Sequence, residues 1–183
     1  MVKKNLVLVW MATLLLLTAC GAEGRGDDSS LNVMFISEVP VHYEENFGPY
    51  LDEILSDSGL DYESIEINVE LFPVSHEKLT ISIIEREVDI FIVDEGLRHI
   101  LLDPYGLQPL DPLMERVTVD VDEFIIQDEA TGEFHLYAIP LNNDSSLVKD
   151  MGLILPTPMI GAITKDSPHT ELALYLLQEF YGN

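Results

Sequence analysis

The sequence predicts an α/β domain of three layers, in which a mostly parallel sheet is flanked by helices. Strand-like and helix-like segments alternate between residues 31 and 93, and the connections between them are short. Such alternation produces right-handed crossovers and therefore parallel strands. The segment VDIFIV (88–93) is almost continuously apolar, which is typical of a strand buried on both faces. Residues 31–183 are long enough to form one domain with a substantial core.

The first half of this domain has the clearest periodicity. Apolar side chains recur at i, i+3, i+4, i+7 and i+8 from Phe47, a spacing that predicts a helix over 47–59. Gly59 is a suitable helix stop, and Ser75 is a suitable cap for a helix that runs to about Glu87. With the strands included, the expected order is strand 31–37, helix 47–59, strand 64–72, helix 75–87 and strand 88–93.

The second half is less regular. The turn sequence DEATGE lies between two apolar segments and predicts a hairpin. Ser167, followed by Pro168 in the first turn, predicts the start of the last helix. The apolar face of that helix comprises Leu172, Ala173, Leu176, Leu177 and Phe180. The other expected elements are a short helix at 97–103, a proline-interrupted strand at 106–113, hairpin strands at 122–127 and 134–141, and strands at 152–156 and 159–165.

The N-terminus has the features of a secretory signal. Two lysines in MVKK precede fifteen uncharged residues (5–19), a run that is short for a membrane span. Leu17-Thr18-Ala19-Cys20 resembles the bacterial lipobox. This resemblance implies a signal peptide at 1–19 and a lipid attached to Cys20 through a diacylglycerol thioether, with fatty-acyl chains such as palmitate. The alternative is an ordinary signal peptide with a chance cysteine.

The lipobox resemblance also implies a location. Cys20 is the only cysteine, so it cannot form an internal disulfide. Residues 20–30 are small, polar and rich in glycine, and they are expected to form the lipid anchor and a flexible tether. No second apolar run approaches spanning length, so we expect the 31–183 domain to be soluble and held at the extracytoplasmic face of the cell membrane by its lipid.

The chain is strongly acidic, with 33 Asp and Glu residues against 9 Lys and Arg residues and a net charge of −24. This field disfavours nucleic acid and anionic lipid as partners. The field is compatible with cationic ligands or metals, but a solvated acidic surface adapted to salty or alkaline surroundings is the preferred explanation, because net charge relates to solubility before it relates to a site.

The order of the segments resembles extracellular solute-binding proteins of ABC importers, which have the type II periplasmic-binding-protein fold. The resemblance rests on INVELFP (67–73), VDIFIVDE (88–95), GLQPLDPL (106–113), LYAIPL (136–141) and the segment 159–180. In that family the chain crosses into a second lobe after a segment like LYAIPL. Here only NNDSSLVKDM (142–151) intervenes before GLILP, and ten residues cannot build a lobe. The chain therefore resembles a single lobe.

The resemblance implies a function in solute uptake. The first hypothesis is a membrane-anchored lipoprotein that binds a small molecule and presents it to an ABC permease or receptor. The missing lobe motivates an alternative, a non-transport lipoprotein that docks a membrane sensor or another protein through the same fold.

Ligands of open parallel sheets bind beyond the carboxyl ends of the strands. Residues that follow the expected strands therefore form a candidate ligand-binding rim: Glu38, His42, Tyr43, Ser75, His76, Asp94, Glu95, Asn142 and Asn143. They are interpreted either as solvated loop residues, or as a ligand rim, or as a metal site that uses His42, His76 and a carboxylate of Asp94 or Glu95. No HxxxH or HxH spacing supports the metal site, and we predict no bound metal.

The remaining histidines, His99, His135 and His169, are expected to lie on the surface or in the core. No hydrolase elbow, phosphate-binding loop, dinucleotide motif or zinc-protease motif is present in the sequence. We therefore expect neither catalysis nor a cofactor.

Overall fold

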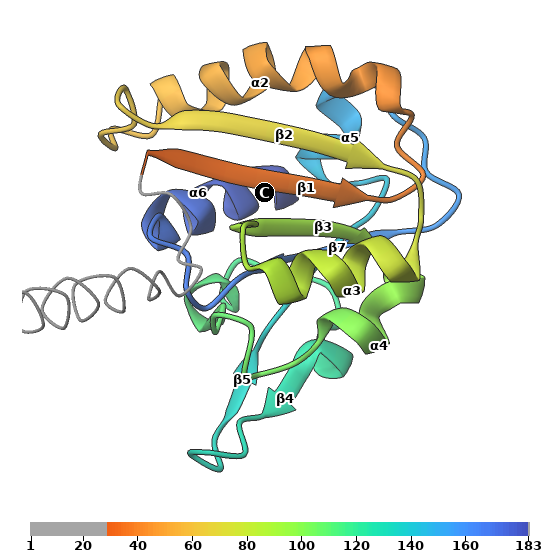
Figure 1. Ribbon diagram of the computed structural model, residues 1–183, viewed down its shortest axis with the longest axis vertical. Coiled ribbons are helices and arrows are strands. Elements are labelled where there is room, and N and C mark those ends of the chain that lie inside the picture. The colour runs from red at the N-terminus through yellow and green to blue at the C-terminus, as the bar shows by residue number, and fades with distance from the viewer. Residues whose placement is uncertain (1–28, 183) are drawn as a thin grey trace, which may run out of the picture.

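The computed structural model describes residues 29–182. The signal peptide at 1–19, the lipid site at Cys20 and nearly all of the tether at 20–30 lie outside the described residues. Within them, the chain forms a mixed α/β domain (Figure 1).

Five strands form the main sheet in the order β2-β1-β3-β7-β6. Their bounds are β1 (Ser30–Ile36), β2 (Glu66–Phe72), β3 (Ile90–Asp94), β6 (Ile139–Leu141) and β7 (Met159–Ile163). Strand β1 pairs in parallel with β2 and β3, whereas β7 is antiparallel to both β3 and β6. Four strands therefore run in one direction and β7 alone runs in the other.

The expectation of a mostly parallel sheet is thus confirmed only in part, because half of the pairings are antiparallel. The reason lies in the chain between β6 and β7, residues 142–158. This segment turns back at the edge of the sheet where β6 ends, so β7 starts at that edge and must run in the opposite direction.

Helices cover both faces of the sheet, which gives the three predicted layers. The main helices are α2 (Glu44–Ser56), α3 (His76–Glu85) and α6 (Thr170–Tyr181). The α6 helix lies behind the sheet in Figure 1 and α3 lies in front of it. The α2 helix packs in the same layer as α6, where Tyr50 stacks on Phe180 with ring centroids 6.3 Å apart.

The core sits where β3 and β7 meet α6. Every residue of both strands is buried, and all five residues of the predicted apolar face of α6 are buried. Edge strand β2 instead alternates, because Glu66, Asn68 and Glu70 are exposed while the residues between them are half-buried. A strand at the edge needs only one buried face.

A buried aspartate, Asp89, connects three strands near their ends, through its side chain and its backbone. Asp89 is 3% exposed, and its Oδ2 accepts a hydrogen bond from the backbone N–H of Asn32 at 2.8 Å. Its backbone carbonyl accepts a second hydrogen bond from the N–H of Thr164 at 2.9 Å. The two bonds connect β1 and the residue after β7 to the residue before β3. The apolar pattern of VDIFIV gave no indication of this role.

Most element predictions in the first half are confirmed, with shifted ends. The first helix starts at Glu44 rather than Phe47 and ends at Ser56, and Gly59 follows with φ +68°. The predicted cap of α3 is confirmed, because Ser75 Oγ accepts from the N–H of Lys78 at 3.2 Å. The helix ends at Glu85, two residues before the predicted end, and the residue that caps it, Arg86, has φ 56°.

Several predictions in the second half are wrong. Residues 106–113 form only an isolated bridge at Leu107 and a 3₁₀ turn, Asp111–Leu113, because prolines lack the N–H that a ladder needs. Residues 152–156 form no strand; their backbone is instead held by the side chain of Asn143. Ser167 does not cap the last helix directly, because α6 starts at Thr170 and Ser167 Oγ accepts from the N–H of His169.

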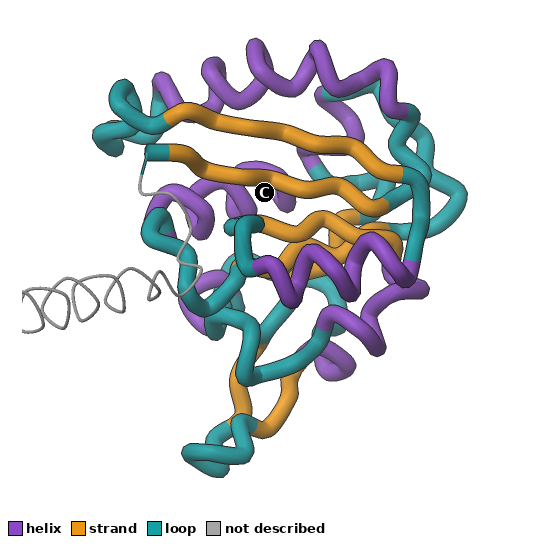
Figure 2. The backbone as a smooth tube through the Cα atoms, in the orientation of Figure 1, coloured by secondary structure: helices purple, strands orange, loops and turns teal. Residues whose placement is uncertain are grey.

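The predicted hairpin is present, but it belongs to a separate two-stranded sheet. Strands β4 (Ile125–Gln127) and β5 (Phe134–Leu136) pair in antiparallel fashion, and they project from the body of the domain (Figure 2). The predicted strand 134–141 is therefore divided, because Tyr137 and Ala138 separate β5 from β6, which joins the main sheet.

The close approach of α6 to β7 gives a first testable prediction. An added Cβ at Gly161 would lie 2.7 Å from Leu177 Cδ2 and 3.3 Å from Ile92 Cδ1. We expect Gly161→Ala to lower the free energy of unfolding by about 1–3 kcal/mol, the usual cost of overpacking a core. Urea unfolding followed by circular dichroism measures this change.

Gly48→Ala is the matched control. Gly48 lies inside α2, and an added Cβ there meets nothing within 4 Å. We expect this variant to be neutral or more stable by up to about 1 kcal/mol, because alanine is the better helix former. Equal destabilisation by the two substitutions would contradict the packing argument.

Candidate functional site

The carboxyl ends of β1, β2, β3 and β6 lie at one edge of the sheet, since these four strands run in the same direction. We call the loops at this edge the rim; it lies to the right in Figure 1. The nine predicted site residues all belong to segments at the rim: Glu38, His42 and Tyr43 after β1, Ser75 and His76 after β2, Asp94 and Glu95 at the end of β3, and Asn142 and Asn143 after β6.

Two of the nine, Ser75 and Asp94, use their side-chain oxygens to shape the rim itself. Ser75 Oγ caps α3, as described above. Asp94 is buried, and its Oδ1 accepts from the N–H of Gly96 at 2.9 Å, which caps the 3₁₀ turn Glu95–Leu97. These oxygens are already engaged in backbone capping.

The two asparagines shape the loop between β6 and β7. Asn143 Nδ2 donates to the carbonyl of Leu155 at 2.9 Å, and its Oδ1 accepts from the N–H of Leu155 at 2.8 Å. Asn142 Oδ1 accepts from the N–H of Asp144 at 2.7 Å. Both side chains thus stabilise the segment that returns the chain to β7.

The residues that follow β1 are more open. Glu38 and His42 are exposed, and the His42 ring lies 4.8 Å from the ring of Tyr43. Across residues 29–182, no three or more His, Cys, Asp or Glu side chains are grouped closely enough to hold a metal ion. The metal interpretation of His42, His76 and Asp94 or Glu95 therefore gains no support.

The rim is hollowed beside α3 and the short helix α4 (Arg98–Leu101). One shallow hollow of about 430 Å³ is lined by His76 and Ile100, among others, and a second of about 530 Å³ is lined by Glu95, His99 and Thr157, among others. The rings of His76 and His99 meet edge to face with centroids 5.6 Å apart. Of the nine predicted residues, His76 and Glu95 line these hollows.

In the second hollow, sequence reasoning missed the side chains of Arg98, His99 and Thr157. The Arg98 guanidinium bonds Glu95 at 3.3 Å and also pairs with Glu123. The position of Arg98 and His99 directly after the β3 loop was the available signal. Thr157 had none, because it is placed at the rim only by the return of the chain from α5 (Ser146–Asp150) to β7.

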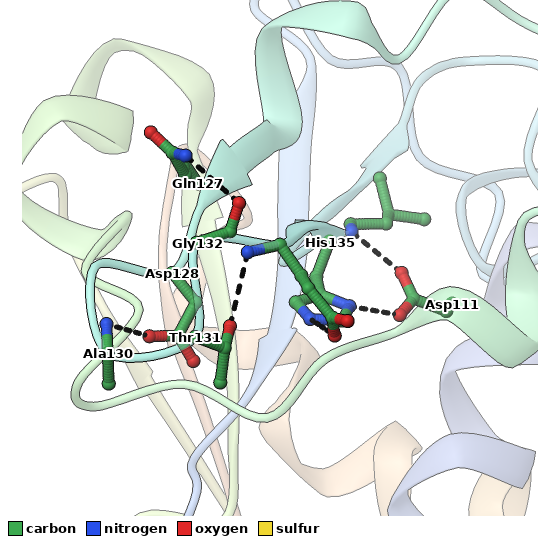
Figure 3. A network of polar contacts seen from close by, with 9 residues as sticks. Asp111, Gln127, Asp128, Ala130, Thr131, Gly132 and His135 are labelled. Atoms are coloured by element: carbon green, nitrogen blue, oxygen red, sulfur yellow. Dashed lines mark hydrogen bonds and ion pairs between the residues drawn. The ribbon is translucent and has the colours of Figure 1, made fainter.

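A polar cluster separate from these hollows holds the base of the hairpin (Figure 3). His135 Nδ1 lies 2.5 Å from Asp111 Oδ2, and Asp111 Oδ1 accepts from the N–H of Leu136 at 2.9 Å. His135 was expected to be a surface or core residue without a particular role. Instead it links β5 to the loop that follows α4, and the hydrogen bond to Asp111 raises its pKa above the usual 6.5.

Comparison with known proteins gives one informative relative. No protein-family model matches the chain. It is similar to a protein of Bacillus subtilis (strain 168) named "Putative lipoprotein YteS", with 30% identity over 111 residues. The match covers 61% of this chain and 65% of the relative, just under two thirds of the relative's length.

This similarity supports the interpretation of the chain as a lipoprotein, and the relative's name states no ligand, activity or partner. In the part of the chain that the structure describes, no helix has the length and apolar character needed to cross a membrane.

The raised pKa of His135 predicts how stability depends on pH. Protonated His135 favours the folded state, so its contribution is complete below about pH 6.5, the unfolded pKa. The contribution disappears as the pH rises through the higher folded pKa. We therefore expect the thermal midpoint of the wild type to exceed that of His135→Gln by more at pH 5.5 than at pH 9.

His42→Gln is the control, because His42 is exposed on the rim and makes no ion pair among the described residues. Its midpoint difference from the wild type should be nearly constant over the same pH range. A flat difference for His135→Gln as well would contradict the role assigned to the Asp111 bond.

Proposed function

We propose that this chain is a lipid-anchored extracytoplasmic protein whose rim docks a partner protein in the membrane. The lipobox at Leu17–Cys20 and the similarity to a protein named as a lipoprotein support the anchor. The observation that carries the docking function is a set of exposed apolar side chains on the rim loops.

Three rim loops each present one such side chain. Val41, after β1, is 53% exposed; Val74, after β2, is 43% exposed; and Ile154, before β7, is 90% exposed. Contiguous apolar patches mark protein interaction sites, and these three side chains share the loops at one end of the sheet. Their positions on three separate loops give a partner a broad surface instead of a single crevice.

The segment between β6 and β7 explains why the rim is open. Residues 142–158 form α5 and a loop, and the buried side chains of Leu147 and Val148 help α5 pack against α6. This segment thus completes the core of the same domain and encloses no cleft over the rim. A small ligand usually buries most of its surface in a cleft, whereas a protein partner can bury an open surface.

The direction of β1 supports the same function. Ser30, the first residue of β1, lies at the edge of the sheet opposite the rim, about 20 Å away for a strand of seven residues. The chain from Cys20 therefore enters the domain at the end of the sheet opposite the rim. This entry point leaves the rim loops accessible to another extracytoplasmic domain.

Binding of a small solute for an ABC-type importer or receptor is the second candidate function. The likeness of the segment order to solute-binding proteins supports it, as do the two shallow hollows beside His76 and His99. The hollows offer imidazole nitrogens, the guanidinium of Arg98 and the hydroxyl of Thr157. Such a ligand would remain largely in contact with water unless a partner covered it.

The anchor is tested by substitution of the lipobox cysteine. Cys20→Ala removes the acylated thiol, so we expect the protein to move from the detergent phase to the aqueous phase in Triton X-114 partitioning and to lose metabolic labelling with a palmitate analogue. Thr18→Ser, which keeps the cysteine, is the control. Retention of the palmitate label by Cys20→Ala would refute the lipid anchor.

The docking function is tested with the exported Cys20→Ala protein added back to membranes of its host. We expect saturable binding that is lost when the membranes are treated with protease. Val41→Ser combined with Val74→Ser and Ile154→Ser should weaken the binding at least about tenfold, because the three lost apolar contacts together need to contribute only about 1.4 kcal/mol for a tenfold change.

Phe134→Ser is the matched control, since Phe134 is equally exposed but lies on the hairpin. Its binding should equal that of the unsubstituted protein. If the rim variant binds as well as this control, docking through the rim is refuted. A solute that raises the thermal midpoint would instead favour the second candidate. Binding to the native state alone stabilises the fold by about 2.7 kcal/mol at a hundredfold excess over Kd.

A further inference from the structure

A hollow larger than the two at the rim lies away from the rim, on the α3 side of β1 and β2. Its volume is about 690 Å³, which is within the range of small-molecule sites. We call it the β1–β2 hollow. None of the residues predicted from the sequence to form a site lines it, and it is independent of the rim function proposed above.

Side chains of β1 and β2, aligned by the register of the two strands, form the floor of this hollow. Asn32 of β1 lies opposite Asn68 of β2, and Met34 lies opposite Glu70. Residues two apart on a strand share a face, so these four side chains point to the same side of the sheet. Asn68 Nδ2 donates to Asn32 Oδ1 at 3.1 Å, which leaves the second N–H of Asn68 and the carboxylate of Glu70 open to the hollow.

One face of α3 forms the wall. Lys78, Ser82 and Glu85 are four and three residues apart, so they lie on the same side of the helix. Glu87, in the turn after α3, completes the lining. The hollow exists because α3 leaves β2 uncovered, as the exposed side chains of Asn68 and Glu70 show.

The charges of the hollow are not balanced internally. Glu70, Glu85 and Glu87 form no ion pair and no side-chain hydrogen bond with any described residue. Lys78 is the single cation, and its ammonium lies over the ring of Phe72, 4.2 Å from the centroid. Three carboxylates from β2, α3 and the following turn therefore face one hollow without a partner.

A buried hydroxyl in the wall is also unpaired. Ser82 is 2% exposed, and its Oγ has no hydrogen-bond partner among the described residues. A buried polar atom without a partner is unfavourable, and a hydroxyl both donates and accepts, so a polar group of a ligand would satisfy it. Ser82 thus indicates a polar ligand independently of the carboxylates, and the carboxylates favour an amine as that group.

From these features we propose that the β1–β2 hollow binds a linear organic polyamine, whose ammonium groups pair with Glu70, Glu85 and Glu87. One N–H donates to Ser82 Oγ, and the alkyl segments lie along the floor formed by Asn32, Met34 and Asn68. A neutral sugar would leave the negative charge of the three carboxylates uncompensated, and an anion would be repelled. A bare metal ion does not fit, because no metal-binding group occurs within residues 29–182.

Isothermal titration of the full-length protein in non-ionic detergent at 150 mM NaCl tests this proposal, with spermidine as the probe. We expect saturable 1:1 binding, weaker binding of 1,4-diaminobutane, and no binding of 1,4-butanediol. Absence of spermidine binding, or equal binding of the uncharged diol, would overturn the proposal.

Charge variants separate a local site from the general acidic field. Glu85→Gln with Glu87→Gln should weaken spermidine binding at least about tenfold. Glu115→Gln with Glu129→Gln removes the same two charges elsewhere on the exposed surface and should change the affinity less than twofold. Equal losses for the two pairs would mean that spermidine binds the diffuse field only, and the proposal would fail.

Ser82→Ala tests the hydroxyl. We expect this variant to bind spermidine about threefold or more weakly while its thermal midpoint stays equal or rises, since the unpaired buried atom is gone. Unchanged affinity would remove Ser82 from the site. The variant that combines Val41→Ser, Val74→Ser and Ile154→Ser should retain full spermidine affinity. This proposal and the docking function can therefore succeed or fail separately.

Discussion

The structure depends on how closely α6 approaches β7 at Gly161. No side chain separates the strand from Leu177 at this point, and the Ile92 and Leu141 side chains of the flanking strands close around the same position. This contact fixes β7 between β3 and β6, and it places the apolar face of α6 over the centre of the sheet. Because β7 occupies that position, β6 can join the sheet only on its far side.

The direction of β7 also determines which loops form the rim. The chain enters β7 at the rim because β7 is antiparallel to β3 and β6, so the loop that carries Ile154 lies at the same end of the sheet as the loops that follow β1 and β2. The side chain of Asn143 holds this loop through both backbone groups of Leu155. The reversal of the chain between β6 and β7 therefore completes the core and leaves the rim uncovered.

The two faces of the sheet differ in how completely they are covered. On the face of α2 and α6, aromatic and aliphatic side chains pack from both helices, as the stacked rings of Tyr50 and Phe180 illustrate. On the face of α3, one helix covers the centre but leaves β2 in contact with water. Polar and acidic residues on β2 are compatible with that exposure, and they give the domain a polar hollow that a fully covered sheet would lack.

The sequence by itself determined the lipobox, the alternation of strands and helices up to residue 94, and the hairpin turn. These features depend on local spacing: the 3.6-residue period of α6, the capping oxygen of Ser75 and the continuous apolar run of β3. Only the tertiary structure decided the direction of β7, the division of 134–141 between two sheets and the pairing of His135 with Asp111, because each depends on residues far apart in the chain. The same holds for the β1–β2 hollow, since strand register and the angle of α3 bring Glu70, Ser82 and Glu85 together, and neither is encoded in a local pattern.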